Sequence, residues 1–246
     1  MAQAASWIAG VDGCPAGWLV VLRHTADREP PRARIVATFA DVLALPEHPA
    51  IIAIDIPIGL PERSGIGGRP ADIAARRVLG ARQSSVFAVP ARSVVMESDY
   101  RQACATALSH SDPPRKVSKQ TFNLFPKMRE VDRLMTPQLQ SRVVECHPEA
   151  AFWAMNGEQP LSEPKKVKSR PNATGLAQRR SLLEAAGFPR TFLESTRFRS
   201  KDAGPDDVLD ACACAWSAGR VLVGSDRRFP ADPTRDGRGL AQEIRA

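Results

Sequence analysis

Residues 6–23 read SWIAGVDGCPAGWLVVLR, and this stretch predicts a β-hairpin. Its first half is strand-like and ends on a carboxylate, that of Asp12. Two glycines and a proline follow between Gly13 and Gly17, which is the composition of a tight turn. A second apolar run begins at Trp18, so the two runs are expected to pair as antiparallel strands.

Three later segments extend this hairpin into a mixed sheet. Apolar and polar side chains alternate over residues 33–39, which predicts a third strand. Asp41 is expected to cap a short helix that runs to Leu45. Residues 51–55 are an apolar run that ends in an acid, which suits a buried central strand. Residues 142–145 form another short strand that ends on an acid. The order of elements predicts an α/β fold with a ribonuclease-H-like mixed five-stranded sheet flanked by helices.

An insertion and several helices complete the expected architecture. After Leu60 the apolar residues show no regular spacing, and the chain is rich in Gly, Pro, Ser and Arg. We therefore expect one ribonuclease-H-like domain over residues 1–246, with a basic insertion or subdomain at about 61–125, after the fourth strand. Helices are predicted over residues 70–79, 98–108, 126–134, 174–186 and 206–223.

The composition is that of an ordinary globular protein. The chain has 246 residues, of which 43% are hydrophobic and 25% are charged. The apolar stretches are too short to span a bilayer, and the first residues lack the pattern of a signal peptide. The five cysteines form no CxxC pair, which favours reduced thiols over disulfides or a zinc site. We therefore expect a cytoplasmic protein that does not enter a membrane.

The net charge of +7 is concentrated in the middle of the chain. Residues 61–130 hold 12 basic and 6 acidic side chains, and residues 131–200 hold 11 and 7. Such a distribution is typical of a surface that faces a polyanion. Scattered surface arginines that serve solubility explain the same charge equally well.

Four acids are placed where the predicted fold brings them together. Asp12 and Asp55 end strands that are expected to be neighbours, and Asp207 and Asp210 lie three apart on one helix. Such a cluster cannot stay ionised without positive charge, and Mg²⁺ or Mn²⁺ supplies it through oxygen ligands. Two such ions can activate water and stabilise the leaving oxygen at a phosphodiester.

Each acid also has a simpler explanation when it is taken alone. Asp12 is a favoured turn residue, and Asp55 precedes the Ile56-Pro57 pair, where an extended backbone is normal. Asp207 lies in a first helical turn, where acids complement the helix dipole. Asp210 is harder to explain in this way because its neighbours are typical of a protein core. The pattern of four is more specific than any one member.

Further charged residues are candidates for the same site. Glu145 ends the strand expected beside that of Asp55 and is a fifth candidate metal ligand. Arg82, Arg92 and Lys127 are candidates for binding substrate phosphates. We interpret His147 as a loop residue, Glu149 as serving the start of the next helix, and the basic residues 165–170 as a solvated loop.

Two families resemble this sequence. Residues 9–18, 53–55 and 207–211 resemble motifs of Holliday-junction resolvases of the RuvC type, although Asp55 stands where those enzymes usually carry Glu. That likeness implies that Asp12, Asp55, Asp207 and Asp210 hold the metal. A closer likeness, to the bacterial domain of unknown function 429, covers nearly the whole chain. That family is described as predicted nucleases of the ribonuclease-H fold. The stretches that carry it are residues 11–18, 55–60, 81–87, 125–132, 145–149, 207–211 and 236–240.

Three functions follow from these patterns. The first is a nuclease that hydrolyses phosphodiester bonds of nucleic acid with Mg²⁺ or Mn²⁺. The second is a catalytically silent module that binds nucleic acid or protein. The third is a nucleotide or sugar phosphotransferase of the actin and hexokinase superfamily, although the sequence shows no second copy of the domain. The oligomeric state is open, and a homodimer is possible because resolvase-like enzymes are often dimers.

Overall fold

A mixed five-stranded sheet forms the centre of the protein. The computed structural model describes residues 5–168 and 170–246. Strands β1 (Trp7–Cys14), β2 (Gly17–His24) and β3 (Arg32–Val36) form an antiparallel meander. Strands β4 (Ile52–Ile54) and β5 (Val143–Glu145) add to β1 in parallel, which gives the order β3-β2-β1-β4-β5. The α/β fold class is confirmed, and the sheet order is consistent with a ribonuclease-H-like fold.

Both faces of the sheet are covered, which explains why its strands are apolar on both sides. Ala9 and Val11 of β1 face one core, which is shared with α1 (Phe39–Leu43) and α5 (Lys119–Leu134). Ile8 faces the opposite core. That second core is built with the helices α6 (Pro148–Met155), α7 (Ala173–Ala185), α8 (Arg190–Ser195) and α9 (Pro205–Leu222).

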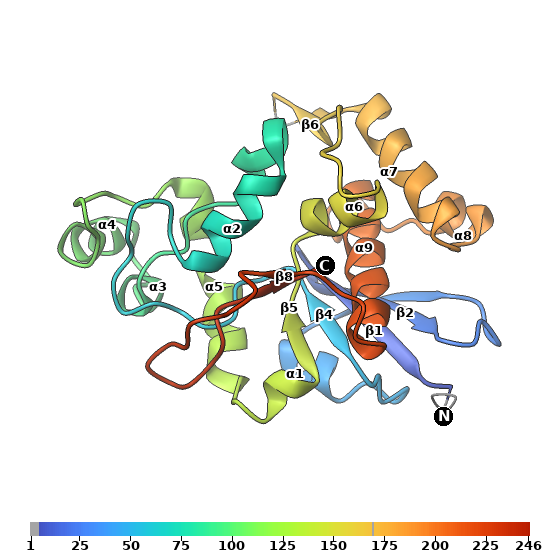
Figure 1. The fold of residues 1–246 in the computed structure, drawn as a ribbon, viewed down its shortest axis with the longest axis horizontal. Coiled ribbons are helices and arrows are strands. Elements are labelled where there is room, and N and C mark those ends of the chain that lie inside the picture. Colours follow the sequence, from blue (N-terminus) through green and yellow to red (C-terminus); the bar gives the residue numbers. More distant parts are fainter. Residues whose placement is uncertain (1–4, 169) are drawn as a thin grey trace.

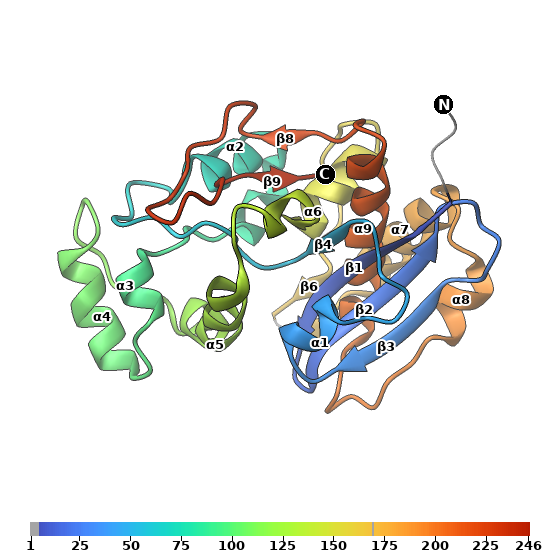
Figure 2. The ribbon, with the colours of Figure 1, turned by 90° about the horizontal axis from the view of Figure 1, so that it is seen from below.

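The predicted insertion contains several short helices. They are α2 (Pro70–Val78), the 3-10 helix η1 (Gly80–Ser85), α3 (Arg92–Val95) and α4 (Tyr100–Ser109). Helices α3 and α4 lie at one end of the molecule, and α7 and α8 lie at the other (Figures 1 and 2). No helix in the described part of the chain is long and apolar enough to cross a membrane.

The remaining elements are small. A 3-10 helix, η2 (Leu139–Ser141), precedes β5. Strands β6 (Lys166–Val167) and β7 (Arg170–Pro171) form a hairpin between α6 and α7. Near the carboxyl terminus, β8 (Arg228–Phe229) pairs with β9 (Ile244–Arg245).

Several predicted boundaries were wrong, and each has a local cause. Thr38 rather than Asp41 is the N-cap residue of α1, which ends at Leu43 rather than Leu45. The third strand ends before Thr38, because the Thr38 hydroxyl caps helix α1 by accepting a hydrogen bond from the Asp41 backbone N–H. Asp41 accepts from Thr38 in return, as in a capping box. Helix α5 begins well before Pro126, because Ser118 caps it by accepting from the Thr121 backbone N–H at 3.0 Å.

Candidate functional site

Asp12 and Asp55 lie side by side, Asp12 near the carboxyl end of β1 and Asp55 directly after the parallel strand β4. Val11 of β1 is in register with Ile54 of β4, and each acid is the next residue along its strand. The Asp55 backbone N–H donates to the Val11 carbonyl oxygen at 2.9 Å, which fixes the two backbones together. The predicted neighbourhood of these two strand ends is therefore observed.

Helix α9 brings the other two acids to the same edge. It packs directly on β1 at Gly10, where a Cβ atom would lie 2.0 Å from the Ala211 carbonyl oxygen. Asp210 precedes this contact point and is buried, at 2% exposure. Asp207 lies one turn earlier, where its carboxylate accepts from the Gly204 backbone N–H at 2.8 Å and so caps the helix.

Burial and mutual repulsion dominate the electrostatics of this carboxylate cluster, defined as Asp12, Asp55, Asp207 and Asp210. Burial raises the pKa of Asp12 well above its usual range, and Asp55, Asp210 and Asp207 raise it further. Burial also raises the pKa of Asp55 to about 6, although His147 opposes the shift. The same cause raises the pKa values of Asp207 and Asp210. The four acids therefore influence one another, as a shared site requires.

A cavity of about 320 Å³ opens beside the carboxylate cluster. Asp12 and Asp55 line it, whereas Asp207 and Asp210 do not. Neither Asp12 nor Asp55 accepts a side-chain hydrogen bond from residues 5–168 or 170–246. The other lining residues are Gly13, Ile56, Pro57, Ser84, Ser85, Phe87, Gln120, Leu124, Lys127, His147, Pro148, Glu149 and Lys165.

The family to which this chain belongs follows from a comparison with protein-family models. The model described as "Protein of unknown function (DUF429)" matches residues 10–235, a span that includes all four acids of the carboxylate cluster. The chain is a member of the DUF429 family. The searches of curated proteins and of solved structures gave no match.

One lysine of this DUF429 chain contacts the carboxylate cluster, and a second pairs with the acid beside it, although neither contact was predicted from the sequence. The Lys165 ammonium forms an ion pair with Asp210, and the Lys166 ammonium lies 2.6 Å from a carboxylate oxygen of Asp206. The interpretation of residues 165–170 as a solvated loop was therefore wrong for Lys165, whereas Lys166 is exposed. Their partners lie far away along the sequence, so spacing could not reveal the contacts.

His147 and Glu149 were also missed as parts of the site. The His147 Nδ1 atom is buried without a hydrogen-bond partner in the described residues, and its ring lies close enough to lower the pKa of Asp55. Glu149 lies in the first turn of α6, as expected, but it also forms a buried ion pair with Arg179. The sequence signal for both was their position just after a strand that ends at the carboxyl edge of the sheet.

Glu145 lies near the carboxylate cluster but is engaged elsewhere. One of its carboxylate oxygens accepts from the Arg69 guanidinium at 2.6 Å, and the other accepts from the Ile58 backbone N–H at 2.7 Å. Arg69 also binds Asp72, so the three side chains form a buried ion-pair triad. Both Glu145 oxygens are occupied, and we leave Glu145 out of the ligand set proposed below.

The three candidate phosphate-binding residues have different surroundings. Lys127 lines the cavity, with its ammonium 4.4 Å from the centre of the Trp18 ring. Arg92 is bound by the carboxylates of Asp132 and Asp236, outside the cavity lining. Arg82 is half-buried in η1 and also lies outside that lining. The structure therefore brings only Lys127 of the three to the cavity beside the cluster.

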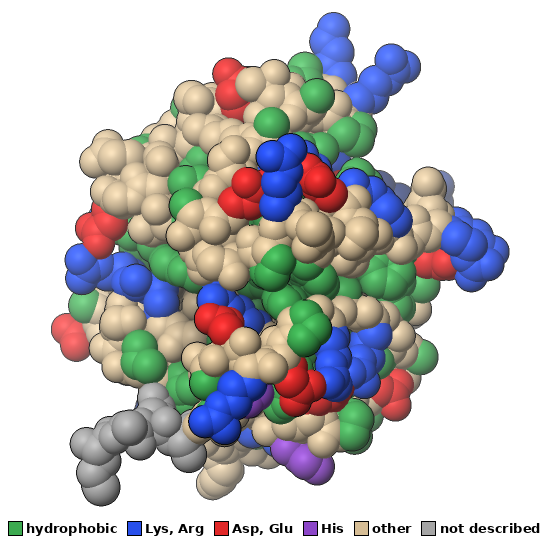
Figure 3. Space-filling view, turned by 90° about the vertical axis from the view of Figure 1, so that its right-hand side faces the viewer, with side chains coloured by type: hydrophobic (Ala, Val, Ile, Leu, Met, Phe, Trp, Pro, Cys, Tyr) green, Lys and Arg blue, Asp and Glu red, His purple; other side chains and the backbone are tan. Residues whose placement is uncertain are grey.

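The surface of the DUF429 chain is mixed in charge where Figure 3 displays it. On that face, Lys and Arg side chains alternate with Asp and Glu side chains. Pairs such as Arg34–Glu47 and Arg190–Glu194 neutralise part of the basic charge. The excess of basic residues in the middle of the sequence is therefore weaker evidence for a polyanion-binding surface than the sequence alone suggests.

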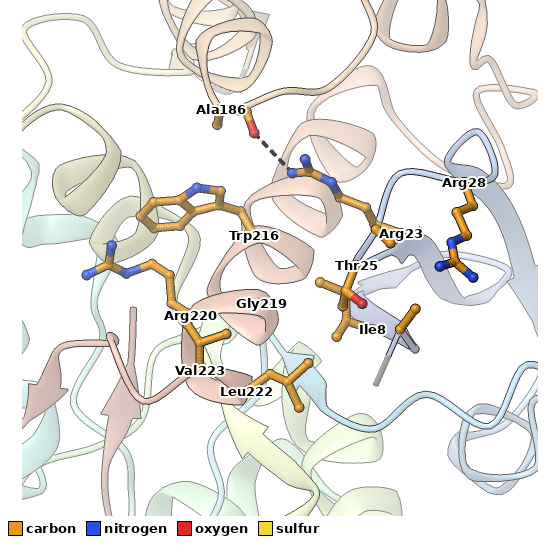
Figure 4. Close-up of a pocket in the computed structure, with 12 residues that line it drawn as sticks. Ile8, Arg23, Thr25, Arg28, Ala186, Trp216, Gly219, Arg220, Leu222 and Val223 are labelled. Atoms are coloured by element: carbon orange, nitrogen blue, oxygen red, sulfur yellow. Dashed lines mark hydrogen bonds between the residues drawn. The ribbon is translucent and has the colours of Figure 1, made fainter. Parts of the chain in front are cut away.

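A second cavity lies at the opposite end of helix α9 and β1 (Figure 4). It measures about 470 Å³, and Trp216 and Arg23 are among its lining residues. The Arg23 guanidinium donates to the Ala186 carbonyl oxygen at 3.0 Å, and Arg220 stacks on Trp216. Its described lining includes no carboxylate, histidine or cysteine, unlike that of the cavity beside Asp12 and Asp55.

The carboxylate cluster offers the donor set that a hard divalent cation prefers. Within residues 5–168 and 170–246, no three acidic, histidine or cysteine side chains converge closely enough to form a finished metal site. Asp12 and Asp55 nevertheless line one cavity without accepting a hydrogen bond from the described residues, and the Lys165 ammonium pairs with Asp210. Carboxylate oxygens that lack hydrogen-bond donors fit Mg²⁺ or Mn²⁺.

Proposed function

We propose that this DUF429 protein is a nuclease that hydrolyses phosphodiester bonds of nucleic acid with a divalent metal ion. The observation that supports this best is the pair of carboxylates Asp12 and Asp55, which lie side by side on adjacent parallel strands; Asp12 is buried and Asp55 is half-buried. They share one cavity and lack hydrogen-bond donors from the described residues. Two such groups cost free energy when both are ionised, and a cation removes that cost.

The residues of the cluster share one part in this proposal. Asp12, Asp55 and Asp210 would hold the metal, and Asp207, in the first turn of α9, would add a further carboxylate beside them. The bound ion would supply activation of water and stabilisation of the leaving oxygen. The Lys127 ammonium lies on the cavity wall, where it would attract a substrate phosphate. The strand ends and α9 hold these groups on rigid elements, which keeps their geometry fixed.

The test is cleavage of labelled DNA and RNA by the wild type and by the Asp12→Asn variant, with Mg²⁺, Mn²⁺ or chelator. We expect metal-dependent cleavage that Asp12→Asn lowers at least about 100-fold, because a ligand of the metal is lost. Asp232→Asn is the matched control, because Asp232 is an exposed carboxylate distant from the cavity lining. Equal cleavage by all three proteins, or cleavage that persists in chelator, would contradict the proposal.

One observation favours a second candidate, a catalytically silent binding module. Lys165 already neutralises Asp210 in the described structure, as it would in a cluster kept for structural reasons. The unfolding midpoint separates the two functions. A metal bound by the native state raises the midpoint as its concentration rises, whereas a silent module without a metal site shows no such change.

A further inference from the structure

The hairpin formed by β6 and β7 is anchored at its base, and its two strands are exposed. The Asn172 side-chain amide donates to the Pro164 carbonyl oxygen at 2.9 Å, and the Asn172 backbone N–H donates to the Lys165 carbonyl oxygen at the same distance. Gly175 of α7 packs so closely that a Cβ atom would lie 2.0 Å from the Pro164 oxygen. The strands, by contrast, are exposed, with Val167 52% accessible.

Two consecutive lysines of this hairpin reach two carboxylates of helix α9. Lys165 pairs with Asp210, and Lys166 pairs with Asp206. The Asp210 side chain is 3% exposed, whereas that of Lys165 is 31% exposed, so the ammonium enters the cluster from the solvent side. Lys165 also lines the cavity that contains Asp12 and Asp55. Within residues 5–168 and 170–246, Lys165 forms the ion pair with a member of the cluster, and its charge lowers the pKa values of Asp12, Asp55 and Asp210.

We propose that Lys165 occupies the position of the divalent cation in the carboxylate cluster and is displaced when the metal binds, so that the β6–β7 hairpin opens. This inference rests on the proposed metal site. An ammonium and a divalent ion repel each other at low dielectric, and here they compete for the same carboxylate oxygens. The long, flexible stem of lysine lets the charge withdraw without movement of the sheet.

The hairpin is well suited to such movement. It joins α6 to α7 at the edge of the molecule (Figure 1), so Lys166 and Val167 can move while both helices stay packed in the core. Opening would also release Lys165 and Lys166 from their carboxylates. In that position they can contact the phosphates of an anionic substrate, so the same lysines would serve the closed and the open state.

The first experiment compares metal affinity in wild type, Lys165→Met and Lys168→Met, from the unfolding midpoint as a function of Mn²⁺ and Mg²⁺ concentration. Lys168→Met is the matched control, because Lys168 is an exposed lysine of the same hairpin without an ion pair in the described residues. We expect a dissociation constant on the order of ten-fold lower for Lys165→Met, since no ammonium must be displaced, and an unchanged one for Lys168→Met.

The second experiment needs no variant. Trypsin is expected to cut wild type after Lys166 or Lys168 faster with saturating Mn²⁺ than with chelator, because the metal releases the hairpin. Equal metal affinity of wild type and Lys165→Met, or a cleavage rate unaffected by metal, would overturn the displacement while leaving the metal site intact. If metal stabilises none of the three proteins, the result contradicts both the proposed metal site and the displacement of Lys165.

Discussion

At the scale of single residues, the environment of the carboxylate cluster disfavours the ionised form of its acids. Asp55 illustrates this, because burial raises its pKa to about 6 although His147 and Lys165 lie near enough to oppose the shift. The ordinary pKa of an aspartate in an unfolded chain is about 3.9. The native protein therefore binds a proton at Asp55 more tightly than the unfolded chain does.

This difference fixes the sign of a pH effect on stability. Where the native state binds more protons, the free energy of unfolding falls as the pH rises. In chelator, we expect the stabilising contribution of protonated Asp55 to be present below about pH 4 and lost as the pH rises through about 6. Asp55→Asn should match wild type at pH 4 and exceed its free energy of unfolding by roughly 1–2 kcal/mol at pH 8.

Urea unfolding of wild type and Asp55→Asn at the two pH values measures this directly. Asp232→Asn, which alters an exposed carboxylate, should show no pH-dependent difference from wild type. A wild type that is more stable than Asp55→Asn at pH 8 in chelator would show that Asp55 is stabilised by its neighbours rather than strained. Added Mn²⁺ should reverse the order, because the wild type alone keeps the complete ligand set.

The sequence allowed the four acids to be proposed, but it did not reveal their neighbours. Asp55 stood out because it ended an apolar strand, and Asp210 because it lay among core residues. Lys165 belonged to a charged run, and such runs are usually solvated. Its contact with Asp210 depends on how α6, α7 and α9 pack, which no local pattern encodes.

At the scale of elements, the close approach of α9 to β1 places the acids. Gly10 makes this approach possible, since a Cβ atom there would lie 2.0 Å from both the Ala211 oxygen and the Ala215 nitrogen. These are backbone atoms, which cannot move aside as a flexible side chain can. The distance between the strand and the helix therefore depends on the absence of one side chain.

The Gly10→Ala variant tests this dependence. We expect it to lower the free energy of unfolding by at least about 3 kcal/mol, because α9 must move away from the sheet. It should also weaken the metal-dependent rise in unfolding midpoint, since Asp207 and Asp210 move with the helix. Gly65→Ala is the control, because a Cβ atom at Gly65 meets no atom within 4 Å. Similar losses in both variants would show that the Gly10 contact is not special.

The elements that sequence predicted best were those with an unbroken apolar pattern. The first hairpin, the strand at residues 52–54 and helix α9 all have such patterns and were found. Helix α5 was predicted too short, because a proline normally starts or ends a helix, whereas Pro126 lies inside this one. Helix α8 was not predicted, because its six residues are too few to show a period.

At the scale of the whole molecule, the Arg69–Asp72–Glu145 triad ties the predicted insertion to the central sheet. Arg69 and Asp72 lie at the start of α2, whereas Glu145 ends β5. All three are buried, so each charge depends on its partners for compensation. The position of α2, and of the cavity wall formed by the residues after it, follows from these contacts.

Removal of the arginine should therefore be costly. We expect Arg69→Met to lower the free energy of unfolding by about 3–5 kcal/mol, because it leaves Asp72 and Glu145 buried without a cation. Arg77→Met, on the exposed side of the same helix, should change it by less than about 0.5 kcal/mol. Urea unfolding monitored by tryptophan fluorescence measures both. A small loss for Arg69→Met would mean that the two carboxylates become protonated at little cost.

The overall architecture was easier to predict than the insertion. Strand order follows from the alternation of strands and helices, and each strand had a clear pattern. Residues 61–125 lack a period because their short helices are held by side-chain contacts such as those of Arg69 and Arg92, rather than by long apolar faces. The division into one domain with an insertion stays a prediction.

The order of the carboxylates along the chain has a consequence for synthesis. Asp12 leaves the ribosome long before Asp210, which follows it in helix α9. Until α9 emerges, β1 lacks the helix that covers it, and Ile8 and Leu19 face water. A chain whose synthesis stops before α9 therefore lacks two of the four acids of the carboxylate cluster and is exposed to aggregation.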